Sequence, residues 1–539
     1  LVLNLKFIKN MKKLKLFILN IFLLINFGCS KDFLDETAYT DVTLDYIYTT
    51  PEGLKAALVG LYQVHRSLYN SNFGESQRAI IMAAKSDLTV VRAGQIALWA
   101  QLRWGHSPDG YQGQLLHAFW KHYYKVIDRS NAIIKNAELS EDLNDEMRIL
   151  LSEAKVLRAE AYFTLFRMFN NIYVTTEPTS PENAFNKINE KSSENEIFEL
   201  IESDLEYAEK YLDWVNTPGK VNLAMAKHLY AKVSMWQSDW EKAIMKSEDI
   251  INSGFYSLMA SPKYVFDGIN NYGARSITPP NRETIFNLQF SNPNIGGGIK
   301  TLINWNYITN YGQIRGAKYD RNYGGRGAGW VYPNQYMLSL FEEDDLRIDN
   351  AYFRTKYYYN DKPNLPAGKS LGDEIKIPLE FTNFWYQRRH PTCLKFSPNK
   401  NDLDWDPNVG VSQANFIIYR LAETYLIASE AYMRLNGNND QNAINYLNRI
   451  RTRAGVETLN FIDQNTVLEE RARELSFEGQ RWYTLKRMGV LFERITQFAG
   501  NDGYKDAARE NMQQHYVNFP IPSDQLDLMG PDYPQNDGY

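Results

Sequence analysis

Residues 420–455 read RLAETYLIASEAYMRLNGNNDQNAINYLNRIRTRAG, and this stretch decides the fold class. Apolar and aromatic side chains recur every three or four positions in its first part, which is the spacing of one helix face. The polar run at 436–440 predicts a turn, a second spaced run follows it, and Gly455 is a typical helix stop. The sequence therefore predicts two helices folded against each other. Their faces carry Leu421, Tyr425, Ala428, Tyr432, Ala443, Leu447 and Ile450.

A similar pair of helices is predicted earlier, on either side of a turn at 237–239. Small alanines lie where the two arms would cross, with aromatic residues beside them, and this arrangement resembles a tetratricopeptide hairpin. Such a hairpin cannot bury its apolar face alone, so neighbouring hairpins must stack and share a core. The arms carry Ala226, Leu229, Val233, Trp236, Trp240, Ala243, Ile244 and Ile251, and Gly254 ends the second arm.

Five further helices are predicted from capping residues and apolar spacing. One starts at Thr50, where Pro51 suits the first turn, and two long ones span about 119–137 and 141–169. A capping box formed by Ser193 and Glu196 begins the fourth. For the last, a second capping box from Thr466 to Glu469 predicts the start, and the helix is expected to continue to Trp482.

The character of the chain changes between about Tyr256 and Gln413. Helical spacing fades there, and Gly, Asn, Pro and Tyr become frequent, as in 296–298 and 324–327. A long stretch without regular helices inside a compact domain is usually functional. This region is therefore predicted to be an insertion of loops and short strands on a helical base.

The N-terminus has the pattern of a targeting segment. Three lysines between 12 and 15 precede the apolar run 16–27, which is too short to span a bilayer comfortably and fits a signal peptide. Gly28-Cys29 then resembles a bacterial lipobox, which predicts a signal peptide over 1–28 and a lipid on Cys29. The alternative is an ordinary secretory signal followed by an incidental cysteine.

Composition and motifs exclude several classes of function. The formal net charge of -5 argues against nucleic acid as a partner, because phosphate binding needs a basic surface. The seven histidines are scattered, no zinc-protease, nucleophile-elbow or phosphate-loop motif occurs, and no cofactor is expected. Asp402 to Asp406 opens like a calcium loop, but Pro407 replaces the required glycine, so no metal is predicted.

Several segments, in order along the mature chain, resemble the SusD/RagB family of Bacteroidetes nutrient-binding lipoproteins. The resemblance implies a mainly α, SusD-like fold with four tetratricopeptide-like hairpins that support a loop-rich half with short strands. On this basis the chain divides at 29–255 (helical), 256–413 (loop-rich, candidate ligand region) and 414–539 (helical). The charged block 470–482 is expected to be mostly structural, with its charges paired. The matching segments are 29–35, 50–62, 153–169, 231–256, 420–423, 447–455, 470–482, 519–522 and 535–539.

The same resemblance implies location, partner and activity. A lipid-anchored protein exposed on the cell outer membrane is expected, working with a SusC-like TonB-dependent transporter that it covers as a lid. Family members bind oligosaccharide or polysaccharide, or peptides in the RagB branch, and are not enzymes. Peptide capture, a glycan-acting enzyme and a pure interaction scaffold remain alternatives.

Aromatic and polar residues in the loop-rich region are the candidate ligand site. An aromatic ring can cover the apolar face of a sugar, while neighbouring polar groups bond its hydroxyls. A second candidate lies near Tyr69, and the two could meet in space. The alternative is that these rings pack the loops together. Arg315, Arg321 and Arg326 suggest an acidic or sulfated glycan, unless they pair with local carboxylates. The predicted ligand-binding residues are Trp305, Tyr307, Trp330, Arg315, Tyr323, Asn72, Trp99 and Trp104.

Overall fold

The computed structural model describes most of the chain after residue 49. The predicted signal peptide and Cys29 lie outside the described residues, as do Asn72, Trp104 and the start of the acidic loop at 402–405. The described ranges are 50–69, 82–91, 99–102, 107–138, 143–266, 281–290, 301–348, 351–376, 388–397, 406–410, 412, 414–500 and 507–539.

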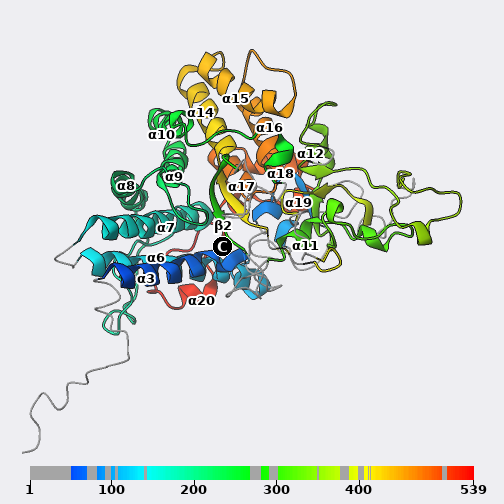
Figure 1. Ribbon diagram of the computed structural model, residues 1–539. Coiled ribbons are helices and arrows are strands. Elements are labelled where there is room, and N and C mark those ends of the chain that lie inside the picture. The colour runs from blue at the N-terminus through cyan, green and yellow to red at the C-terminus, as the bar shows by residue number, and fades with distance from the viewer. Residues whose placement is uncertain are drawn as a thin grey trace, which may run out of the picture.

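Eight helices pack in chain order as successive pairs and form one side of the molecule (Figure 1). The mainly α fold predicted from the sequence is confirmed. Helix α10 packs on both α9 and α14, so the third pair of the N-terminal part joins the pair of the C-terminal part directly. The pairs are α3 (Pro51–Arg66) with α6 (Gly110–Glu138), α7 (Asp145–Phe169) with α8 (Glu194–Tyr211), α9 (Leu223–Trp236) with α10 (Trp240–Asn252), and α14 (Leu421–Asn436) with α15 (Gln441–Ala454).

Helix α7 lies at the centre of the array, and every residue from Leu150 to Phe169 is buried. A helix surrounded on all sides must also bury its polar residues, so these need partners. Arg158 is paired with Asp204 of α8, because its Nε and Nη2 each donate a hydrogen bond of 2.7 Å to that carboxylate. Thr50 caps α3 as predicted, and the capping box of Ser193 and Glu196 on α8 is confirmed.

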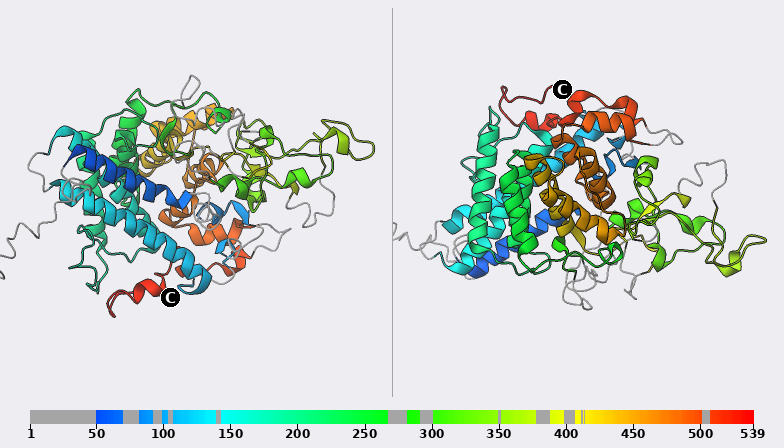
Figure 2. Two further views of the ribbon diagram at one scale, coloured as in Figure 1. Left: turned by 60° about the horizontal axis from the view of Figure 1, so that its bottom comes forward. Right: turned by 90° about the horizontal axis from the view of Figure 1, so that it is seen from above.

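Among the residues that the structure describes, three small antiparallel sheets hold the loop-rich part on the helices. Strand β1 (Thr89–Val91) pairs with β3 (Val331–Pro333), β2 (Thr284–Leu288) pairs with β6 (Phe416–Arg420), and β4 (Phe353–Arg354) pairs with β5 (Thr392–Cys393). The first two sheets join segments on opposite sides of the predicted boundaries at 256 and 413. The loop-rich part also contains α11 (Ile303–Tyr307), α12 (Gln335–Ser339) and single turns of 3₁₀ helix. Figure 2 shows this part projecting away from the helix pairs, with 351–376 reaching furthest.

The C-terminal elements differ from prediction at two points. They are α16 (Gln464–Leu475), α17 (Arg481–Arg487), α18 (Leu491–Phe498), α19 (Ala508–Asn511) and α20 (Ser523–Leu526). The predicted capping box is wrong, because Asp463 is the cap and accepts from both the backbone N–H and the hydroxyl of Thr466. The predicted helix to Trp482 is also wrong: it ends at Leu475, and Phe477 takes a positive φ of 68° in the turn before α17.

Buried ion pairs lock the C-terminal helices to the loop-rich part. Glu474 of α16 is fully buried and lies 2.6 Å from Nη1 of Arg420, and the same Nη1 atom lies 2.9 Å from Glu283 of the loop-rich part. Arg347, from the loop-rich part, lies 2.5 Å from Glu470. Because a buried charge is costly unless it is paired, these contacts fix how the elements meet. The prediction that the charges of the 470–482 block are paired is confirmed for Glu470, Arg473, Glu474, Glu478 and Arg481.

Candidate functional site

Trp305 is the predicted ligand residue whose surroundings fit the prediction best. It lies on α11, its side chain is half-buried, and the guanidinium of exposed Arg326 lies 5.4 Å from the centre of its ring. Gly410 packs so closely on the indole that an added Cβ would come within 1.9 Å of its Cε3 atom. Backbone bonds from Ala328 N–H to the Trp305 carbonyl and from Trp330 N–H to the Asn306 carbonyl tie the neighbouring loop to α11. The indole is therefore held in one orientation.

Two predicted ligand residues are buried in the core instead. Trp99 has no exposed surface, packs on Phe519 with ring centres 5.3 Å apart, and holds the ammonium of Lys85 over its ring at 3.9 Å. Tyr307 is 1% exposed and stacks on Phe396. Both rings are large apolar surfaces at the junction of elements, where burial gains more than exposure. For these two residues, packing is the role that the structure shows.

The remaining described candidates lie in different surroundings. Tyr323 is half-buried against Tyr311 and Arg354, whose guanidinium lies 4.2 Å from its ring centre. Trp330 is half-buried and packs on the main core. Arg315 is exposed. None of these three residues lines either of the two cavities described below.

An aromatic cavity of about 80 Å³ lies between the helix pairs and the loop-rich part. It brings together Tyr69 and Tyr307, one residue from each of the two predicted candidate regions. Sequence reasoning missed most of its lining, because only packing brings α6, β6 and α17 to one place. The ring-bearing residues that line it are Tyr69, Phe119, Tyr123, Tyr307, Phe416, Tyr419, Phe477 and Tyr483.

Glu160 of α7 is one of the charged groups on this cavity, together with Arg167 and Glu478. Its carboxylate lies 2.7 Å from His65 Nε2 and accepts a hydrogen bond from the Tyr419 hydroxyl. Burial alone would raise the pKa of Glu160, but the contacts with His65 and Tyr419 outweigh it and the pKa is lowered. Burial raises the pKa of Tyr69 well above its usual range. The cavity therefore carries an ionised carboxylate among neutral phenols.

Within the described ranges, no group of three or more His, Cys, Asp or Glu side chains could hold a metal ion. Cys393 is buried, and burial raises the pKa of its thiol to about 12, so it stays protonated and is a poor nucleophile. No helix in the described part is both long and apolar enough to cross a membrane.

The architecture is that of a helical-repeat scaffold with a loop-rich insertion. Two family models match the chain: one described as the SusD family over 282–539, the other described as "Starch-binding associating with outer membrane" over 32–233. Between them they span most of the chain, and it belongs to the SusD/RagB family. The predicted resemblance is confirmed.

The similar proteins and solved structures match nearly the whole length of this chain. SusD-like protein P25 of Formosa agariphila is 25% identical, over 96% of this chain and 97% of its own length. A SusD homolog from Bacteroides thetaiotaomicron superposes with a TM-score of 0.72 at 20% identity, covering 94% of this chain and 100% of the other. A structure described as "Laminarin binding SusD-like protein" superposes with a TM-score of 0.71 at 22% identity, covering 91% of this chain and 100% of the other.

Proposed function

We propose that this protein captures oligosaccharide or polysaccharide at the cell surface and delivers it to a SusC-like TonB-dependent transporter, without catalysing a reaction. Membership of the SusD/RagB family supports the proposal, as do similar proteins whose titles name laminarin binding and surface glycan binding. The observation in this chain that carries it is the Trp305 indole, held by Gly410 beside the exposed Arg326.

The chemistry of this pair suits a sugar ring. A pyranose has an apolar C–H face that gains free energy when an aromatic ring covers it. Its hydroxyl rim accepts hydrogen bonds, and a guanidinium offers five N–H donors. Because the indole is already fixed in place, little conformational entropy is lost when a ligand binds. Trp305 would supply the flat contact, and Arg326 the polar one.

An anionic glycan is the ligand class that the charges favour. Arg315 and Arg326 are both exposed, and neither makes an ion pair with a carboxylate of the described residues. The alternative considered from the sequence, pairing with local carboxylates, is therefore not what the described structure shows for these two. A sulfate or uronate group would supply the missing charge partner.

Affinity measurements across a panel of neutral, uronic-acid and sulfated polysaccharides test the proposal. Trp305→Ala should weaken binding by at least about tenfold, since it removes a flat contact of about 1.4 kcal/mol or more. Trp330→Ala tests the second predicted ring. Trp214→Ala, a half-buried ring stacked on Phe255 far from α11 in sequence, is the matched control and should leave affinity unchanged. Unchanged affinity in the Trp305 variant, or product release from any glycan, would contradict the proposal.

We also propose that Cys29 carries the lipid that anchors the protein to the outer membrane. The lipobox-like Gly28-Cys29 behind a short apolar run supports this, as does the family description that names outer-membrane association. Cys29→Ala should move the protein from the membrane fraction to the soluble fraction after cell lysis. The matched control is Cys393→Ala, which should stay with the membrane. Retention of the Cys29 variant in the membrane would refute the anchor.

A further inference from the structure

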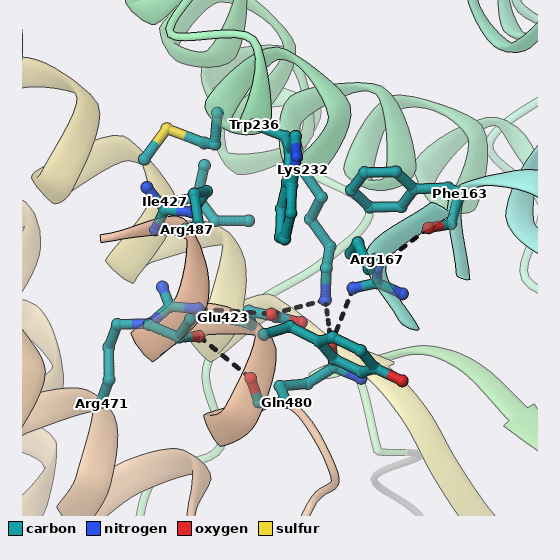
Figure 3. Close-up of a pocket in the computed structure, with 12 residues that line it drawn as sticks. Phe163, Arg167, Lys232, Trp236, Glu423, Ile427, Arg471, Gln480 and Arg487 are labelled. Atoms are coloured by element: carbon teal, nitrogen blue, oxygen red, sulfur yellow. Dashed lines mark hydrogen bonds and ion pairs between the residues drawn. The ribbon is translucent and has the colours of Figure 1, made fainter. Parts of the chain in front are cut away.

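A second cavity, of about 30 Å³, lies where three helix pairs meet the C-terminal helices. Its walls come from α7, α9, α14, α16 and α17. Figure 3 shows the polar side chains that line it converging from these helices, with the ends of Lys232, Arg167 and Gln480 close to Glu423 and Arg471. It shares the wall residues Arg167, Gln480 and Tyr483 with the aromatic cavity but lies on the side away from the loop-rich part.

Positive charge exceeds negative charge around this cavity. Four cations line it: Arg167, Lys232, Arg471 and Arg487. Glu423 is the one carboxylate on its wall, and Glu430 stands behind Arg487 at 2.7 Å. The cations therefore outnumber these carboxylates by two.

The other titratable groups nearby do not restore the balance. His228 lies at hydrogen-bond distance, 3.0 Å, from Glu423, and burial lowers the pKa of this histidine. This contact occupies part of the Glu423 carboxylate, so less of it remains to pair with the cations. Glu160, across the wall, is held by His65 and Tyr419. Burial lowers the pKa of Lys232 to about 8 although Glu423 opposes the change. The existing carboxylates thus offset the cations incompletely.

The guanidinium of Arg471 shows most directly that an anionic partner is missing. It is 6% exposed, and its one contact with a carboxylate is Nη2 to Glu423 at 3.5 Å. Its Nε and Nη1 are buried and have no hydrogen-bond partner among the described residues. Arg471 lines the cavity, so these donors border an interior space.

Arg167, on the opposite wall of the cavity, also lacks a carboxylate partner among the described residues. It is 5% exposed, and among the described residues its guanidinium donates to neutral groups alone. These are the Phe163 carbonyl, the Thr164 hydroxyl and the Gln480 side-chain oxygen, at 3.2–3.4 Å. The rings of Phe163 and Tyr483 lie 4.2 and 4.3 Å from it. Two buried guanidiniums with incomplete charge pairing would be costly without a further anion.

We propose that this cavity is a binding site for a small monovalent anion of the chloride class, held between Arg471, Lys232 and Arg167. A space of 30 Å³ admits one or two water-sized species, which suits a halide and excludes tetrahedral anions such as sulfate. The anion would accept from the unpartnered donors of Arg471 and neutralise part of the excess charge. It would join three helix pairs to the C-terminal helices, so its role is to stabilise the scaffold independently of any glycan.

Thermal unfolding of the full chain in sodium chloride and in sodium gluconate, at constant ionic strength, tests the site. Tm should rise with the logarithm of chloride concentration, by about 2 °C from 10 to 300 mM, and bromide should act like chloride. Arg471→Met should abolish this rise. The matched control is Arg473→Met on the same helix, which is equally buried but pairs with Glu470 at 2.9 Å and should keep the rise.

A bromide-soaked crystal of the unaltered protein gives a second readout that needs no variant to fold. An anomalous peak between Arg471 and Arg167 is expected. Three results would overturn the proposal: equal Tm in chloride and gluconate, an equal chloride response in the two arginine variants, or no peak in the cavity. A larger response to sulfate than to chloride would overturn the assignment to a monatomic anion.

Discussion

Single side chains decide whether the loop-rich part presents a ring to a ligand. Trp305 and Tyr307 are two residues apart on α11, yet one is half-buried and the other is 1% exposed. The difference comes from their neighbours, because Tyr307 stacks on Phe396 in the core while Trp305 packs on Gly410 beside the guanidinium of the exposed Arg326. Because Gly410 has no side chain, the Trp305 indole can pack directly against it.

Replacement of Gly410 by alanine tests this close approach. The added methyl group would collide with the indole, so Gly410→Ala should lower the free energy of unfolding by about 1–3 kcal/mol, as overpacking does. In a Trp305→Ala background the space is open, and the same change should cost little. Equilibrium denaturation of the four proteins measures the coupling.

Gly60→Ala is the matched control for this cycle. Gly60 lies within α3, and the nearest heavy atom to an added Cβ is 4.0 Å away. Alanine should therefore stabilise the protein by about 0.5–1 kcal/mol through helix propensity. Additive effects of the changes at 410 and 305 would show that the indole is not held by Gly410.

At the scale of elements, the helices were predictable because their signals are local. The spacing of Leu421 to Tyr432 and the turn at 436–440 both lie within one hairpin, and α14 and α15 form as expected. The failure at α16 is also local, because two cap candidates lie three residues apart. Asp463 has a carboxylate that takes both the N–H and the hydroxyl of Thr466, and a charged acceptor at a helix N-terminus outcompetes a hydroxyl.

The site was less predictable because its parts are distant in the chain. Aromatic content alone cannot separate a ring that faces a ligand from one that fills the core, and Trp99 was indistinguishable in sequence from Trp305. The aromatic cavity needs Tyr123 of α6, Phe416 of β6 and Tyr483 of α17, which only tertiary packing brings together. The cavity proposed for an anion has the same origin, since tertiary packing brings α7, α9 and α14 together with α16 and α17.

At the scale of the whole molecule, buried charge adds to a continuous apolar core that runs through the helix pairs, the loop-rich part and the C-terminal elements. Glu423, Glu430, Glu470 and Glu474 are each 4% exposed or less, and each bonds a basic side chain from another element. Breaking such a pair leaves an uncompensated charge and costs about 3–5 kcal/mol. The contact between α16 and the loop-rich part therefore depends on Glu470 and Glu474 staying ionised, because both pair with Arg347.

This dependence predicts how stability changes with pH. Burial alone would raise the pKa of Glu474, but Arg453, Arg420 and Arg347 hold it well below the usual range, and cationic neighbours likewise lower the pKa of the other three glutamates. A carboxylate with a lowered folded pKa stabilises the fold fully above its unfolded pKa, and that contribution is lost as pH falls toward the folded value. The free energy of unfolding should therefore fall steeply below about pH 5. Urea denaturation at steps from pH 7 to 3.5 measures the slope.

The variant Glu474→Gln assigns part of that slope to one residue. It should be less stable at pH 7, because Arg420 and Arg453 lose their shared anion, yet its acid slope should be shallower by up to about 1.4 kcal/mol per pH unit, one proton fewer being taken up on unfolding. Glu343→Gln, at an exposed position, is the control and should retain the full slope. If the Glu474 variant kept the slope of the unaltered protein, proton uptake by Glu474 would not contribute to the acid sensitivity, and the prediction for this residue would be wrong.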